Sequence, residues 1–143
     1  MYTYVIIDDE PLIRRGTKKK LEPLSHLLTC CGEASDGREG LELVRQLKPD
    51  IVILDMQMPV MDGTELLPAL SEEFPSTALI VISGFQNFDY MKQAISSKVI
   101  DYILKPFSKD EIQQTVLKTI DSLKDKEAED HHLTSMVQEK EEA

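Results

Sequence analysis

The chain has 143 residues, a formal net charge of −10, 41% apolar residues and 29% charged residues. This length suits one domain whose hydrophobic core needs no disulfide or structural metal. The two cysteines, Cys30 and Cys31, are adjacent, and neighbours on a strand point to opposite faces, so they cannot easily pair. No apolar run approaches the roughly 18 residues of a membrane span, and the N-terminus lacks a signal-peptide pattern. We therefore expect a protein of the reducing cytoplasm without membrane association.

The negative charge is spread over the whole chain. Residues 125–143 carry seven acidic and two basic residues, a net of −5, and residues 1–124 carry the other −5. Neither part favours nucleic acid as a partner. Basic residues cluster only between Arg14 and Lys20, on a predicted helix. We interpret this cluster as a solvated helix face, with a partner contact as the alternative.

Five apolar runs alternate with five helical patterns along the chain. Strands are expected near residues 3–8, 28–33, 50–54, 78–82 and 100–104. Helices are expected near residues 11–23, 36–47, 64–73, 87–97 and 108 to about 126. Pro11 opens the first helix, and Ser108 with Glu111 forms a capping box at the last. Apolar residues at helical spacing on the last two helices are interpreted as core-facing: Met91, Ala94, Ile95, Ile112, Val116, Ile120 and Leu123.

Strict alternation of strands and helices predicts a doubly wound α/β fold with a parallel sheet. Charged residues follow three of the predicted strands: Asp8 and Asp9, then Asp55, then Lys105. Open α/β sheets bind ligands at the carboxyl ends of their strands, so we expect these side chains to converge. Carboxylates held together repel each other unless a cation neutralises them. The sequence therefore predicts a site for magnesium and phosphate.

Several separated motifs resemble the receiver domain of bacterial two-component response regulators. They are the runs Asp8–Pro11, Leu54–Gly63, Ser83–Gly84 and Asp101–Phe107. The resemblance covers roughly residues 1–124, and in detail it is nearest to YesN-like receivers, which are attached to AraC-type DNA-binding domains. It implies a flavodoxin-like (βα)5 sandwich with a five-stranded parallel sheet in the order 2-1-3-4-5.

The resemblance also implies a role for each charged residue. Asp55 would be the phosphoacceptor, since its carboxylate can attack phosphorus in line. One of Asp8 and Asp9 would bind Mg²⁺ directly and the other through water, and Asp55 with the backbone carbonyl of Gln57 would complete the protein ligands. Lys105 would pair with the acceptor and then with the phosphoryl oxygens.

Further residues are implied to assist or report the phosphorylation. Ser83 would donate its hydroxyl to the phosphoryl group, and Gly84 would leave room for the donor. Tyr102 corresponds to the family's switch aromatic, and the peptide bond before Pro106 is implied to be cis. Simpler interpretations stay open: the acidic pair could cap a helix, Ser83 could be a turn residue, and Tyr102 could be a packed strand aromatic.

The implied function is a phosphorylation-activated switch that receives a phosphoryl group from a sensor histidine kinase. It would control an attached DNA-binding domain and so regulate transcription. Self-phosphorylation and autodephosphorylation, both dependent on Mg²⁺, are the only chemistry expected, so the chain is not predicted to be an enzyme. The output domain, or a second copy of the chain, would dock on the fourth helix, fifth strand and fifth helix.

Residues 125–143 are expected to form an acidic helix extension or a linker to an output domain absent from this chain. A single-domain receiver or a scaffold is the alternative. A haloacid dehalogenase-like phosphatase is a weaker alternative, because such enzymes need a second acid two residues after the nucleophile, and Gln57 stands there.

Overall fold

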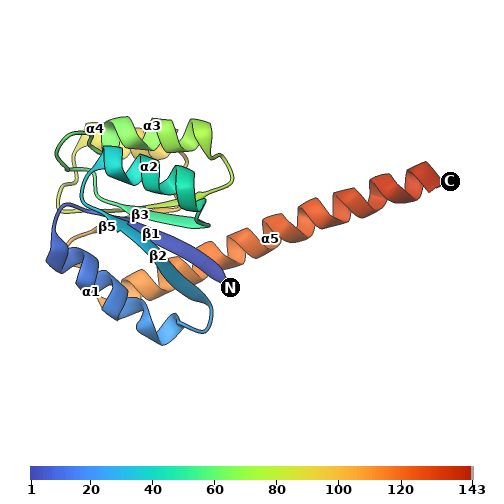
Figure 1. Cartoon of the computed structure of the whole chain (residues 1–143), viewed down its shortest axis with the longest axis horizontal. Coiled ribbons are helices and arrows are strands. Elements are labelled where there is room, and N and C mark those ends of the chain that lie inside the picture. The colour runs from blue at the N-terminus through green and yellow to red at the C-terminus, as the bar shows by residue number, and fades with distance from the viewer. Residues whose placement is uncertain (143) are drawn as a thin grey trace.

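Five parallel strands form one sheet in the computed structural model, and helices cover both of its faces (Figure 1). The structure describes the backbone of residues 1–142 and the side chains of residues 1–128. The strands are β1 (Tyr2–Ile7), β2 (Leu28–Ala34), β3 (Ile51–Leu54), β4 (Ala78–Ser83) and β5 (Asp101–Leu104). Their order in the sheet is β2-β1-β3-β4-β5, with every neighbouring pair parallel. The predicted doubly wound α/β fold and strand order are confirmed.

Five α-helices and one short 3₁₀ helix connect the strands. They are α1 (Pro11–Leu21), η1 (Glu22–Leu24), α2 (Gly37–Leu47), α3 (Gly63–Glu73), α4 (Phe88–Ser96) and α5 (Lys109–Glu142). One core lies between the sheet and the pair α1 and α5, and a second lies between the sheet and α2, α3 and α4. No helix within the described residues is long and apolar enough to cross a membrane.

The sheet separates the two cores because successive strand side chains point to opposite faces. In β1, Ile6 packs into the core under α1 and α5, whereas Val5 and Ile7 pack into the core under α2 and α3. All four residues of β3 are buried, as are all six of β4. Burial on both faces explains why these strands are continuous apolar runs, and each large side chain buried there contributes about 1.5–3 kcal/mol.

Three expectations about the helices were wrong in detail. The first helix ends at Leu21, and the chain then turns as a 3₁₀ helix containing Pro23, since proline lacks the N–H that a longer α-helix would need. Ile95 is 74% exposed although it was expected in the core, because the buried stripe of α4 is narrow and includes Ala94. The last helix continues to Glu142 instead of ending near residue 126.

The projecting half of α5 has a simple local cause. The sequence after Ser108 contains neither glycine nor proline, the two residues that most often end a helix. Figure 1 shows this half leaving the sheet as a single straight helix. The expected boundary at residue 124 and the linker role of residues 125–143 stay predictions, and residue 143 lies outside the described residues.

Candidate functional site

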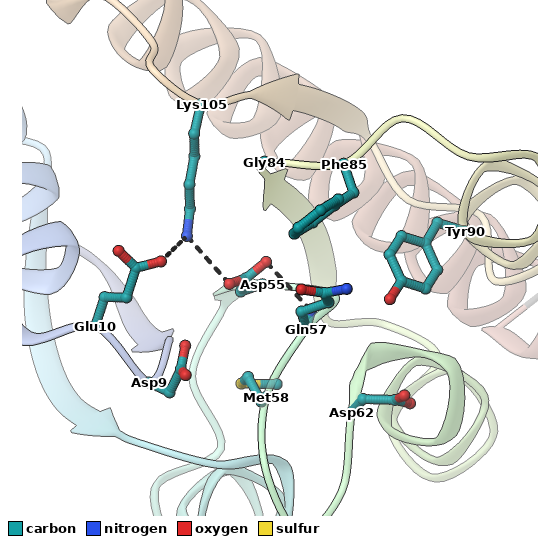
Figure 2. Close-up of a pocket in the computed structure, with 10 residues that line it drawn as sticks. All are labelled: Asp9, Glu10, Asp55, Gln57, Met58, Asp62, Gly84, Phe85, Tyr90 and Lys105. Atoms are coloured by element: carbon teal, nitrogen blue, oxygen red, sulfur yellow. Dashed lines mark hydrogen bonds and ion pairs between the residues drawn. The ribbon is translucent and has the colours of Figure 1, made fainter.

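The carboxyl ends of β1, β3 and β5 bring the predicted acidic residues and lysine to one edge of the sheet. Here the strand order reverses, because β1 lies between β2 and β3, and such reversals open a crevice in doubly wound sheets. A pocket of about 440 Å³ occupies the crevice (Figure 2). Its lining residues are Asp9, Glu10, Asp55, Gln57, Met58, Asp62, Gly84, Phe85, Tyr90 and Lys105.

Backbone hydrogen bonds extend the sheet one residue beyond three of its strands and hold the site rigidly. The Asp8 N–H donates to the Ala34 carbonyl at 3.0 Å, and the Asp55 N–H donates to the Ile7 carbonyl at 3.0 Å. The Lys105 N–H donates to the Ser83 carbonyl at 2.8 Å. The backbones of these predicted site residues are thus held by hydrogen bonds to neighbouring strands, although the residues lie just after the strands in sequence.

Lys105 lies among three carboxylates. Its Nζ is 2.9 Å from Asp8 Oδ2, 3.1 Å from Asp55 Oδ2 and 3.2 Å from Glu10 Oε1. The Lys105 side chain is only 12% exposed, and Asp8 is fully buried. Figure 2 shows the Lys105 side chain extending toward Asp55 and Glu10, with its ammonium group between their carboxylates. The structure therefore brings the predicted acceptor and the predicted lysine into direct contact.

Burial and charge act in opposite directions on these groups. Burial raises the pKa of both Asp8 and Asp55, and Lys105 partly offsets this rise; the Asp8 carboxylate raises the pKa of Asp55 further. Burial lowers the pKa of the Lys105 ammonium, but the contacts with Asp8 and Asp55 outweigh it, so its pKa is raised. Lys105 is therefore a permanent positive charge at neutral pH, beside carboxylates that gain from any additional cation.

The oxygen atoms at this edge fit a divalent metal ion. Asp8, Asp9, Glu10 and Asp55 can each place a carboxylate oxygen within 4.8 Å of the others. Asp8 Oδ2 is buried and lies beside Lys105, yet among the described residues no hydrogen bond of good geometry reaches it. A set of carboxylate oxygens is the donor type that Mg²⁺ prefers. The residues present are thus suited to hold Mg²⁺.

Glu10 was quoted in a motif but given no role by the sequence. The structure places its carboxylate in the acidic group and in contact with Lys105. The available signal was its position, since it is the third consecutive acid after β1 and directly precedes Pro11.

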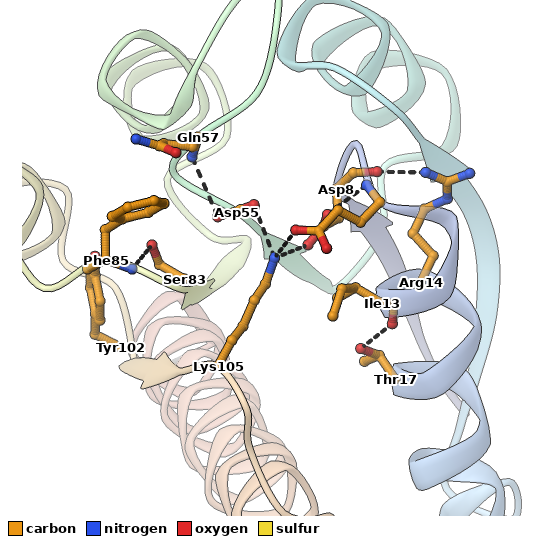
Figure 3. A network of polar contacts seen from close by, with 11 residues as sticks. Asp8, Ile13, Arg14, Thr17, Asp55, Gln57, Ser83, Phe85, Tyr102 and Lys105 are labelled. Atoms are coloured by element: carbon orange, nitrogen blue, oxygen red, sulfur yellow. Dashed lines mark hydrogen bonds and ion pairs between the residues drawn. The ribbon is translucent and has the colours of Figure 1, made fainter.

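Ser83 and Tyr102 both contact Phe85, which lines the pocket (Figure 3). Ser83 is fully buried at the end of β4, and its Oγ accepts a hydrogen bond from the Phe85 N–H at 3.1 Å. The Tyr102 hydroxyl donates to the Phe85 carbonyl. Ser83 thus holds the N–H of Phe85, and Tyr102 holds its carbonyl. The Phe85 ring projects into the pocket (Figure 2).

Three remaining site candidates surround this arrangement. The Gln57 N–H donates to Asp55 Oδ1 at 3.3 Å, whereas Lys105 contacts the other oxygen of this carboxylate. A Cβ added to Gly84 would meet no atom within 4 Å, so the pocket is open above this residue. The Lys105–Pro106 peptide bond is cis.

Comparisons with known proteins point to one family. The family model described as the response regulator receiver domain matches residues 4–117. An uncharacterized response regulatory protein of Staphylococcus epidermidis is 39% identical over 106 residues, which are 74% of this chain and 41% of that protein. The uncharacterized transcriptional regulatory protein YesN of Bacillus subtilis is 38% identical over 124 residues, 87% of this chain and 34% of that protein.

A solved structure shares the fold closely. The receiver domain of AraT, a response regulator from Geobacillus stearothermophilus, superimposes with a TM-score of 0.82 at 33% identity. The match covers 88% of this chain and 98% of the other. The chain thus matches nearly the whole length of an isolated receiver domain. It spans only about two fifths or less of the length of the curated relatives.

Proposed function

Because this chain belongs to the response regulator receiver domain family, we propose that it is a switch operated by phosphorylation of Asp55. The observation that carries the proposal is the position of Asp55, 3.1 Å from the Lys105 ammonium at the base of an open acidic pocket. This carboxylate is nearly buried, but it lines a pocket that a phosphodonor can enter, and it has a fixed positive charge beside it. Such a charge stabilises a transferring phosphoryl group.

The proposed donor is a phosphohistidine of a sensor kinase. An Asp55 carboxylate oxygen attacks the phosphorus, the new P–O bond forms as the P–N bond breaks, and the electron pair returns to the imidazole nitrogen. Lys105 and the Gln57 N–H orient the carboxylate from two sides. Asp8, Asp9 and Asp55, with the Gln57 carbonyl, would hold Mg²⁺, which when bound supplies positive charge to the carboxylate and phosphoryl oxygens. Slow loss of the phosphoryl group to water is the only other covalent chemistry that we propose.

Asp55→Asn tests the acceptor. Incubation of the wild-type chain with Mg²⁺ and a small acyl phosphate should add one phosphoryl group, measured by intact mass, and removal of the metal by a chelator should prevent it. Asp55→Asn should remain unlabelled because an amide is not a comparable nucleophile. Asp62→Asn is the matched control: Asp62 lines the same pocket and caps α3, and asparagine caps equally well. Undiminished labelling of Asp55→Asn would place the acceptor elsewhere.

The proposed partners are a histidine kinase and an output domain that regulates transcription. Support for the output comes from the relative named as a transcriptional regulatory protein, of which this chain covers only 34%. Exposed apolar side chains on α4 and β5 offer a docking face for that domain or for a second copy: Phe88 is 78% exposed, Ile95 74% and Leu104 40%. Location in the cytoplasm, where such kinases act, is part of the same proposal.

We propose that Ser83 and Tyr102 pass the signal to that face. A phosphoryl group on Asp55 adds acceptor oxygens that can draw the Ser83 hydroxyl away from the Phe85 N–H. Movement of the Phe85 loop would then release the Tyr102 hydroxyl from the Phe85 carbonyl and allow an inward rotamer. Lys105 binds the phosphoryl oxygens in the same state.

Ser83→Ala tests this coupling separately from phosphorylation. The variant should still accept a phosphoryl group, since the acceptor, acidic residues and lysine remain. Amide shifts of residues 87–107 on phosphorylation should be smaller than in the wild type, because coupling energies of about 1–3 kcal/mol give partial shifts in population. Ser83→Thr keeps a hydroxyl and is the control. Equal responses in wild type and Ser83→Ala would show that the hydroxyl does not transmit the signal.

A further inference from the structure

Arg14 connects the acidic loop after β1 to the edge strand of the sheet. Its side chain is only 18% exposed. Nη1 donates to the Asp8 carbonyl at 2.6 Å, and Nε donates to Glu33 Oε1 on β2 at 3.3 Å. Figure 3 shows the guanidinium beside the backbone of Asp8, on the side away from Lys105. We propose that Arg14 is a positioning residue that fixes the peptide between Asp8 and Asp9 and thereby sets the affinity of the site for its cation. This inference rests on the proposed function.

The covalent geometry of the backbone explains why this contact matters for Asp9. The Asp8 carbonyl belongs to the planar peptide group that leads into Asp9, so its direction determines where the Asp9 Cα and side chain lie. Asp9 is exposed, and no side-chain hydrogen bond or ion pair holds it among the residues whose side chains are described. Asp8, by contrast, receives the Glu10 N–H on its own carboxylate at 2.9 Å. The orientation of Asp9 therefore depends on its backbone, and Arg14 is the side chain that holds that backbone.

The guanidinium is itself held in place. Glu33 accepts from Arg14 and also from Lys18, whose Nζ lies 2.6 Å from Glu33 Oε2. Lys18 is one turn after Arg14 on α1, so both cations reach the same carboxylate on β2. The planar fork of arginine presents separate nitrogens to the Asp8 carbonyl and to Glu33, whereas a lysine would have to reach both acceptors from a single nitrogen.

Electrostatics alone predicts the opposite effect of removing Arg14. Loss of a positive charge close to a cation site reduces repulsion and should tighten Mg²⁺ binding. Loss of a positioning contact should weaken it, because side chains that orient metal ligands typically change metal affinity by roughly 10-fold or more when removed. The sign of the change therefore distinguishes the two roles.

The experiment measures Mg²⁺ affinity by isothermal titration calorimetry on the whole chain, which contains no tryptophan for a fluorescence assay. Arg14→Met should weaken Mg²⁺ binding by roughly 10-fold. Arg15→Met is the matched control: it removes the same charge from the next residue, whose side chain is exposed and makes no hydrogen bond or ion pair with the described residues. It should leave the affinity unchanged or slightly tighter. At saturating Mg²⁺, the labelling rate of Arg14→Met should approach that of the wild type, since the acceptor is intact.

Binding by Arg14→Met that equals or exceeds the wild-type affinity would overturn the proposal. Thermal unfolding without Mg²⁺ checks that the variant is folded. If it is not, Arg14→Lys decides, because it keeps the charge but loses the fork: weaker Mg²⁺ binding supports positioning, and unchanged binding refutes it. Absence of Mg²⁺ binding in the wild type would refute the proposed function too. A wild type that binds Mg²⁺ and is labelled on Asp55, with Arg14→Met unaffected, would refute only this inference.

Discussion

At the scale of single residues, Lys105 compensates the negative charge of the buried carboxylates Asp8 and Asp55. It is the only basic group within ion-pair distance of Asp8 and Asp55 among the described residues, and both of those carboxylates are nearly or fully buried. Removing one partner from a buried ion pair leaves the other charge without compensation, which is costly. Lys105 therefore compensates the charge of the buried acids, and in the proposed function it would also bind a phosphoryl group on Asp55.

Val60, in the loop after β3, has an unfavourable backbone conformation for its type. Its φ is 69°, a left-handed value that branched side chains rarely adopt, and its side chain is 62% exposed, so little packing compensates. Asparagine tolerates this conformation. We expect Val60→Asn to raise the free energy of unfolding by about 1 kcal/mol, measured by urea denaturation. Val60→Ile, which keeps the branch, should leave it unchanged. A less stable Val60→Asn variant would show that the valine side chain is stabilising.

At the scale of the element, two helical glycines differ in what surrounds them. A Cβ added to Gly16 on α1 would meet nothing within 4 Å, whereas one added to Gly37 at the start of α2 would collide with the Met61 carbonyl. We expect Gly16→Ala to stabilise the chain by about 1 kcal/mol, since alanine favours helix. Gly37→Ala should destabilise it by about 1–3 kcal/mol, because the backbone must move.

Thermal and urea unfolding of the two alanine variants provide the comparison, with each serving as the control for the other. The Gly37 N–H also donates to the Met61 carbonyl at 3.0 Å, so the loop after β3 is packed directly against α2. Equal effects of the two substitutions would show that helix propensity, and not this close contact, decides the outcome.

At the scale of the whole molecule, charge argues against contact with DNA. The chain carries a net charge of −10, and its lysines on α1 are partly engaged: Lys18 pairs with Glu33, and the Lys20 ammonium lies over the Phe107 ring at 4.5 Å. Affinity for duplex DNA depends largely on neutralising phosphates. We expect residues 1–143 alone to produce no sequence-selective shift of duplex DNA in a gel, even at low salt. A selective shift that salt abolishes would contradict this expectation.

Local sequence patterns were sufficient to predict the α/β fold and the residues that follow each strand. The strand order was predicted by the family resemblance. Continuous apolar runs become strands buried on both faces, and residues after such strands meet at one edge of the sheet. Asp8, Asp55 and Lys105 are therefore recognisable as candidate site residues from their positions in the chain. Strict alternation of strand and helix is similarly a property of the linear chain.

Contacts between distant side chains, by contrast, depend on the tertiary packing. The contact between Lys105 and Glu10 joins residues 95 positions apart. The hydrogen bond from Arg14 to the Asp8 carbonyl depends on the position of α1 relative to β2, where Arg14 also contacts Glu33. The exposure of Ile95 likewise depends on which face of α4 meets the sheet. Sequence periodicity specifies a face to within a broad stripe, but the rotamer and packing of each side chain are set by its neighbours in space.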